Sequence, residues 1–378
     1  MKKVIVVSST LTNAMQTAKK VVSKKSVLPI LECFLCEVKI ENKRANLLVK
    51  GTDLENHISV SINCEAKEEF KFVIHSDELA FIEKLDEQPL CLEIDETTCE
   101  VKILAEGETV KAIGEKVEDY PITPNSPFKL LGTLANEFFP ELKTSLKYVS
   151  DPKDFNPKYK GVGIETIEQG IVIVGTDAFT LRLTNQKAEI SNGAIGEKFV
   201  LNPTLCKQLA SFKNAENIHI SLMKMKGGTN TVLTFELNSM QVTIVSRNLD
   251  SDMVDYKRIL PTYSATTVSM GKKDLMKRID KAILYTNDST HQGIFSINGK
   301  VVLTASELDS KKEYRSEFAH TVKVGEDIDI SFNLAFLKKV LSDLNGESVN
   351  IEMTAPFKAA VIKDGDTLTI LMPIMIAA

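Results

Sequence analysis

The sequence predicts an α+β fold in which one unit of helices and antiparallel strands occurs three times along the chain. Two landmarks recur at the same spacing, and the segments between them alternate apolar and polar residues, as in antiparallel sheets. The chain has 378 residues, of which 43% are hydrophobic and 26% charged. That length suits two or three domains, each with a modest core.

The first landmark is a pair of strands followed by a Thr-Asp corner or its equivalent. It occupies residues 32–55, 161–179 and 293–308. Asp53 and Asp177 stand at the first two corners, 124 residues apart, and Ser306 follows 129 residues later. This spacing is that of a small domain.

The second landmark is a short helix between two strands. It begins at His75, Asn202 and Asn333, so successive copies start 127 and 131 residues apart. Because two independent landmarks share one period, a true internal repeat is indicated.

Each unit also opens with an amphipathic helix. In the second unit Pro140 must lie in the first helical turn or kink the helix. We expect three domains, each with two helices packed on antiparallel sheets, at residues 1–125, 126–260 and 261–378. The predicted apolar stripes are Leu11, Met15, Ala18 and Val22; Leu134, Phe138, Leu142, Leu146 and Val149; and Leu275, Ile279, Ala282 and Ile283.

Basic residues recur beside these stripes in all three units, although the net charge is −5. One charged helix face is usually only a solvated face, but repetition on equivalent helices favours a positive surface suited to a phosphate backbone. The predicted DNA-binding residues are Lys19, Lys20, Lys24, Lys25, Lys143, Lys147, Lys272, Lys273, Lys277, Arg278 and Lys281.

No catalytic or metal-binding motif is found, so we predict no catalytic residue, no metal and no cofactor. The Cys33-x-x-Cys36 pair lies in a predicted strand, where residues three apart point to opposite faces, and buried thiols are the simpler interpretation. Asp53 and Asp177 are expected to bond backbone amides at their corners. An enzyme acting on DNA through an unrecognised carboxylate site stays open as an alternative.

No apolar run reaches the roughly 18 residues needed to span a bilayer. The apolar stretch near the N-terminus is too short for a secretory signal, and the small-residue cleavage site of such a signal is not found after it. We expect a cytoplasmic protein.

The sequence resembles the beta subunit of bacterial DNA polymerase III, the DNA sliding clamp, over essentially the whole chain. Each motif alone is weak, but together, in this order and on a threefold repeat, they are specific. The matching segments are Leu28-Pro29-Ile30-Leu31, Gly51-Thr52-Asp53-Leu54-Glu55, Asp119-Tyr120-Pro121, Thr176-Asp177-Ala178-Phe179-Thr180-Leu181, Asp255-Tyr256-Lys257-Arg258-Ile259-Leu260-Pro261, Phe332-Asn333 and Leu371-Met372-Pro373-Ile374-Met375-Ile376.

The resemblance implies the DNA-clamp processivity fold and a head-to-tail homodimer that forms a ring around double-stranded DNA, without sequence preference or an active site of its own. The implied partners are the DNA polymerase III catalytic subunit, the clamp loader, other polymerases and repair proteins. Lys25 matches a DNA-contacting position of the family. Positions matching the family's dimer contact are Val110 and Ala112 on one side, and Ile283 and Leu284 on the other.

The resemblance further implies a hydrophobic pocket that docks short linear motifs of these partners. Its adaptable Met and aliphatic lining, with Asn and Arg to fix a peptide backbone, suits that role. The matching positions are Tyr159, Thr176, Ala178, Phe179, Thr180, Leu181, Val254, Arg258, Ile259, Asn333, Phe336, Phe357, Ala359, Ile370, Met372, Pro373, Ile374, Met375 and Ile376.

Three positions depart from the family pattern. Thr180 and Met375 stand where the family usually has arginine, and Val254 stands where proline is usual. We expect these changes to make the pocket more apolar. They leave open a second interpretation, a divergent clamp paralogue that serves repair or a mobile element.

Overall fold

The computed structural model describes residues 1–22, 26–151, 153, 156–307, 312–319 and 321–376. Lys24 and Lys25 lie outside these residues. The described chain forms two compact units. Unit 1 comprises Met1–Pro140, Lys187–Glu197 and Thr204–Asp250, and unit 2 comprises Glu141–Gln186, Lys198–Pro203 and Ser251–Ala378. The three domain boundaries expected from the repeat stay a prediction.

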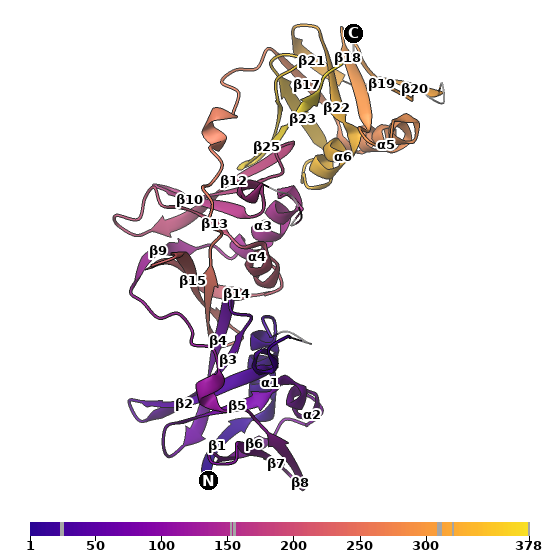
Figure 1. Cartoon of the computed structure of the whole chain (residues 1–378). Helices are drawn as coiled ribbons and strands as arrows, with labels where there is room; N and C mark the ends of the chain where they lie inside the picture. The colour runs from indigo at the N-terminus through magenta and orange to yellow at the C-terminus, as the bar shows by residue number, and fades with distance from the viewer. Residues whose placement is uncertain (23–25, 152, 154–155, 308–311, 320, 377–378) are drawn as a thin grey trace. The chain divides into compact units, whose positions relative to one another are not determined.

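Unit 1 contains two helices and antiparallel strands (Figure 1). Its elements are β1 (Lys2–Val7), α1 (Ser8–Ala18), β2 (Cys33–Glu41), β3 (Arg44–Thr52), β4 (Asn56–Ala66), β5 (Phe70–His75), α2 (Leu79–Ile82), β6 (Pro89–Asp95), β7 (Glu100–Ala105), β8 (Glu108–Ile113), β9 (Phe128–Leu134), β14 (Ala215–Met225), β15 (Gly228–Leu237) and β16 (Met240–Arg247).

Unit 2 holds the C-terminal third of the chain and part of the middle. Its elements are β10 (Val162–Ile167), β11 (Gly170–Thr176), β13 (Lys198–Leu201), β17 (Thr266–Gly271), α5 (Lys272–Ala282), β18 (Gln292–Ile297), β19 (Val301–Glu307), β20 (Lys312–Phe318), β21 (Thr321–Gly325), β22 (Ile328–Asn333), α6 (Leu334–Ser342), β23 (Ser348–Met353), β24 (Ala360–Asp364), β25 (Thr367–Leu371) and β26 (Pro373–Ile374). Three further elements pass from one unit to the other: α3 (Phe138–Ser145), β12 (Thr180–Ile190) and α4 (Pro203–Leu209).

The α+β prediction is confirmed: six α-helices and antiparallel strands make up the described chain. A strand, an opening helix, further strands, a second helix and two or more strands follow one another three times, with α1, α3 and α5 as opening helices. Leu11, Leu142 and Leu275 on these helices are buried, as the apolar stripes predict. Pro140 is the third residue of α3 and so lies in its first turn, where a missing N–H costs no helical bond.

The two Thr-Asp corners have the same hydrogen bonds. Asp53 Oδ1 accepts from the amides of Glu55 at 3.1 Å and Asn56 at 2.6 Å. Asp177 Oδ1 accepts from the equivalent amides of Phe179 at 3.0 Å and Thr180 at 2.6 Å. The prediction that both aspartates bond backbone amides is confirmed.

Glycine precedes each corner because the strand there touches the end of the opening helix. A Cβ on Gly51 would lie 2.6 Å from the carbonyl oxygen of Ala18, and one on Gly175 would lie 2.4 Å from that of Ser145. Either contact is too short for any other residue without movement of backbone.

In unit 2, α5 packs beside α6 against the strands of the third repeat (Figure 1). Leu275, Ile279, Phe295, Leu337 and Val349 belong to one buried core. None of the helices in the described residues is long and apolar enough to cross a membrane.

Candidate functional sites

An exposed apolar surface gathers in unit 2, around the C-terminal segment. Phe179 is 58% exposed, Phe357 62% and Met375 73%, and Met372 and Ile259 are also exposed. Exposed apolar groups clustered in this way mark binding surfaces in soluble proteins.

Strand pairing brings the distant segments of this surface together. β12 pairs with β25, with Thr180 opposite Leu371. The amide of Met372 then donates to the carbonyl of Phe179 at 2.9 Å. β26 pairs with β22, and Gln292 donates from Nε2 to the carbonyl of Met375 at 3.2 Å. Met372 is thereby held beside the Asp177 corner.

Two aromatic rings form one wall of this surface. Phe179 at the corner and Phe336 on α6 stack with ring centroids 5.7 Å apart and an interplanar angle of 26°. Asn333 lies at the start of α6, where its Oδ1 accepts from the amides of Ala335 at 2.9 Å and Phe336 at 3.1 Å. The Asn333 side-chain oxygen therefore caps the helix, which fixes Phe336, and this acceptor is already used.

The segment before Arg258 is tied to β10 through a buried carboxylate. Glu165 accepts from Tyr256 Oη at 2.8 Å and from Lys257 Nζ at 2.8 Å. Burial raises the pKa of Glu165, but the hydrogen bonds from Lys257 and Tyr256 outweigh it, so the pKa lies below its ordinary value. Ile259, two residues after Lys257, is exposed.

A cavity of about 350 Å³ opens at this surface. It is lined by Arg258, Ile259, Leu260, Pro261, Thr262, Tyr263, Thr354, Phe357, Lys358, Ala359 and Met372. Five residues of the predicted pocket therefore line one cavity: Arg258, Ile259, Phe357, Ala359 and Met372.

The other predicted pocket residues do not line this cavity. Thr176, Thr180, Leu181 and Ile370 are buried, whereas Ala178, Pro373 and Ile374 are partly exposed or exposed, as are Tyr159 and Val254. Ile376 is 37% exposed.

The structure differs from the expectation that Thr180 makes the pocket more apolar. Lys339 of α6 brings its ammonium to 2.9 Å from Thr180 Oγ1 and 2.9 Å from Asp177 Oδ2. A cation is thus present beside Thr180. Sequence reasoning missed Lys339; its position three residues after Phe336, on the same side of a helix, was the available signal.

Of the predicted DNA-binding residues, three lysines on α5 form an exposed stripe. Lys273, Lys277 and Lys281 follow one another at four-residue spacing, and none has an ion pair within the described chain. Lys272 and Arg278 are engaged instead: Lys272 Nζ donates to the Leu344 carbonyl at 2.7 Å, and Arg278 pairs with Asp274 at 3.0 Å.

The basic residues of the other helices are also at the surface. Lys143 and Lys147 are exposed on and just after α3, and Lys147 pairs with Asp343. Lys19 is partly exposed and Lys20 exposed, just after α1, and Lys20 Nζ donates to Ser211 Oγ at 2.7 Å.

The predicted dimer-contact residues lie on β8 and just after α5. Leu284 is 76% exposed and Ile283 partly exposed. On β8, Val110 is partly exposed and Ala112 is buried.

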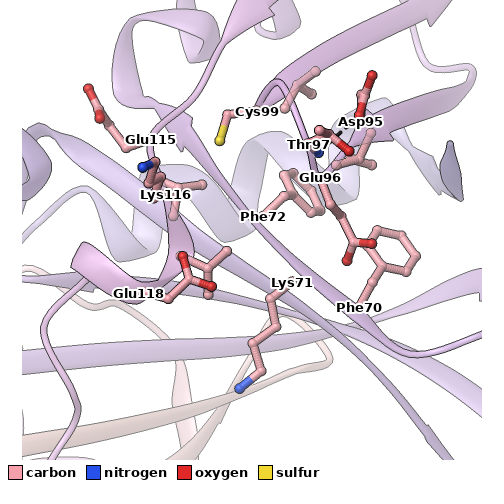
Figure 2. Close-up of a pocket in the computed structure, with 14 residues that line it drawn as sticks. Phe70, Lys71, Phe72, Asp95, Glu96, Thr97, Cys99, Glu115, Lys116 and Glu118 are labelled. Carbon is pink, nitrogen blue, oxygen red and sulfur yellow. Dashed lines mark hydrogen bonds between the residues drawn. The ribbon is translucent and has the colours of Figure 1, made fainter.

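A larger cavity, of about 590 Å³, lies in unit 1 and contains none of the predicted site residues. Figure 2 shows Glu115, Lys116 and Glu118 on one side of it and Asp95 and Glu96 on the other, with Phe72 between them. Asp95 accepts from the Thr97 amide at 3.0 Å, as a turn residue does. The described residues that line this cavity include no nucleophile paired with a base.

The cysteines fit a structural role. Cys36 and Cys206 are buried, and burial raises the pKa of the Cys36 thiol to about 12. Within the described ranges, no group of three histidine, cysteine, aspartate or glutamate side chains is placed to hold a metal ion.

Comparisons with known proteins agree along the whole chain. The sequence model of the DNA polymerase III beta subunit, N-terminal domain, matches residues 2–124, and that of the C-terminal domain matches residues 257–375. The beta sliding clamp of Chlamydia trachomatis is 20% identical over 376 residues, 98% of this chain and 86% of that protein.

Two solved structures have the same fold. The DNA polymerase III beta subunit of Thermotoga maritima superimposes with a TM-score of 0.79 at 22% identity and covers 100% of both chains. The sliding clamp of Pseudomonas aeruginosa bound to griselimycin gives a TM-score of 0.81 at 17% identity, covering 99% of this chain and 100% of that one.

Proposed function

Because the chain belongs to the DNA polymerase III beta subunit family, whose members are non-catalytic processivity subunits, we propose that it is a sliding clamp: two copies close head to tail around duplex DNA and tether a polymerase. The exposed apolar surface of unit 2 docks short motifs of the polymerase, the clamp loader and repair proteins. The observation that carries the ring is the pairing of strands between successive repeats.

In unit 1, β4, the strand after the first corner, pairs with β16, the last strand of the second repeat. In unit 2, β12, the strand after the second corner, pairs with β25, the third strand after the second helix of the third repeat. Each of the first two repeats thus pairs the strand after its corner with the third strand after the second helix of the next repeat.

Two strands are left over by this rule. Among the described residues, β20, which follows the third corner, pairs only with β19, and β8, the last strand of the first repeat, pairs only with β7. Exposed strand edges join readily to another chain. When β20 of one copy joins β8 of a second copy, and the second β20 joins the first β8, the contact closes and gives a ring.

The solution mass tests this closure. We expect twice the 41.9 kDa chain mass by light scattering at micromolar concentration. Leu284→Asp, which removes an exposed apolar side chain beside β20, should give the single-chain mass. Ile122→Asp is the matched control, because Ile122 is 91% exposed and outside the predicted contact. A single-chain mass for the unaltered protein would contradict the ring.

The docking surface has its own test. A phage-displayed library of random peptides is selected on the unaltered protein, and the most enriched peptide is synthesised with a fluorescent label. We expect apolar sequences whose binding Met375→Asp weakens. Enriched peptides that bind Met375→Asp equally well would contradict the assignment of this surface.

A divergent paralogue is the second candidate, favoured by the changed residues Thr180 and Met375 at the docking surface. It binds partners of repair or of a mobile element in place of the main replicase. Replacement of the host's replicative clamp by this chain separates the two: growth supports the replicative role, and failure with normal ring mass supports the paralogue.

A further inference from the structure

Lys339 of α6 is hydrogen-bonded to the Asp177 corner. Its ammonium lies 2.9 Å from Asp177 Oδ2 and 2.9 Å from Thr180 Oγ1. These two partners are 162 and 159 residues away in sequence, so the contact connects separate parts of unit 2. The Lys339 side chain is 22% exposed and that of Asp177 16%, so water screens the pair only in part.

The same ammonium lies against aromatic rings. It is 5.2 Å from the centre of the Phe336 ring and 4.8 Å from that of Tyr148. Phe336 in turn stacks on Phe179, which belongs to the Asp177 corner. Lys339 therefore contacts both supports of the aromatic wall, the corner through Asp177 and the helix through Phe336.

The first corner shows what the fold itself requires. There Asn56, which stands where Thr180 does, donates from Nδ2 to Asp53 Oδ1 at 3.2 Å and to Oδ2 at 3.0 Å. No lysine or arginine pairs with Asp53 in the part of the chain that is described. A neutral donor is therefore enough to hold such a corner, and the lysine is an addition where the corner carries Phe179.

We propose that Lys339 is a positioning residue of the docking surface, which rests on the proposed function: it locks the Asp177 corner to α6 and so presents Phe179 and Phe336 as one preformed wall for an apolar peptide side chain. Without the lysine, Phe179 keeps its turn but loses its fixed distance from α6. The peptide must then order the wall when it binds, which lowers affinity.

The lysine brings a positive charge to the corner from α6. Because Thr180 Oγ1 and the ammonium are 2.9 Å apart, an arginine at position 180 reaches the same place beside Asp177 from the opposite element. The charge is carried by α6 in this chain, and supplying it from β12 instead should restore the lock.

The test uses the full-length protein and the labelled peptide selected on it. Lys339→Met removes the charge and keeps an apolar stem over the rings. Lys338→Met is the matched control, since Lys338 neighbours it on α6 and pairs with Asp280 instead. Lys339→Ala with and without Thr180→Arg tests the move of the charge, and Lys339→Arg tests its conservation.

We expect Lys339→Met to weaken peptide binding about tenfold, which corresponds to about 1.4 kcal/mol. Lys338→Met should bind within twofold, and Thr180→Arg in the Lys339→Ala background should recover most of the loss, as should Lys339→Arg. If Lys339 only stabilised the fold, its loss would lower the urea midpoint, and Thr180→Arg would not restore peptide binding to the Lys339→Ala protein.

Equal binding by Lys339→Met and the unaltered protein would overturn the proposal, and so would a Thr180→Arg, Lys339→Ala protein no better than Lys339→Ala. Either result leaves the docking surface itself in place. Absence of any selected peptide sensitive to Met375→Asp would instead contradict the proposed docking function.

Discussion

Replacement of the exposed lysine stripe of α5 by glutamine should reduce the salt dependence of DNA binding. Lys273, Lys277 and Lys281 are exposed at four-residue spacing without ion pairs in the described chain, whereas Lys272 and Arg278 are engaged in contacts within the protein. The three free lysines are therefore the ones on α5 available to phosphates.

The magnitude follows from counterion release. With one phosphate neutralised by each lysine, the triple variant should lower the slope of log K against log salt by roughly 2.7 per chain. Between 50 and 200 mM salt, the unaltered protein then loses roughly 40-fold more affinity than the variant from these contacts alone.

The assay is fluorescence anisotropy with a labelled duplex, titrated at several salt concentrations. The control is a triple glutamine variant of Lys43, Lys67 and Lys226, which are exposed on turns of unit 1 and change the net charge equally. An unchanged slope in the α5 variant would refute the reasoning, and an equal fall in the control would show an effect of net charge only.

Three further outcomes are expected. Arg182→Met should destabilise the protein by about 3 kcal/mol in urea unfolding, because the buried guanidinium pairs with Glu141 at 2.9 Å and the carboxylate would be left without it; an unchanged midpoint would contradict this. Glu165→Gln should make the free energy of unfolding depend less on pH. The folded-state pKa of Glu165 is lowered, so the carboxylate stabilises the fold above the ordinary carboxyl range, and this stabilisation is lost as pH falls through the folded pKa. Parallel pH profiles for the variant and the unaltered protein would show that the carboxylate is not responsible. Gly175→Ala should cost about 1–3 kcal/mol, since its Cβ would lie 2.4 Å from the Ser145 carbonyl oxygen, whereas Gly227→Ala, with nothing within 4 Å, should be neutral; equal midpoints for the two would refute the close approach.

The sequence predicts the features that depend on residues close together in the chain. The Thr-Asp corners follow from the short reach of an aspartate side chain to amides two and three residues ahead, and both corners have those bonds. The apolar stripes of the opening helices follow from helical period, and Leu11, Leu142 and Leu275 are buried accordingly.

What the sequence did not predict depends on contacts between distant segments. From the sequence alone, Lys339 is predicted to be an ordinary solvated lysine. Its contact with Asp177 depends on the fold of unit 2, which brings α6 next to the corner before β12. The sequence predicts Arg278 as a free cation on the basic helix, but the guanidinium lies 4.8 Å from the centre of the Phe318 ring on β20. No periodicity encodes such tertiary pairings.

The most direct measurement of the central claim is retention on DNA of different topology. The protein is loaded by a bacterial clamp loader onto nicked circular DNA, separated by gel filtration, and the DNA is then cut once with a restriction enzyme. A closed ring predicts that the protein stays with the circle and leaves once the circle is cut, because only the loss of closure frees it. Equal retention on circular and cut DNA would show ordinary surface binding and would contradict encirclement.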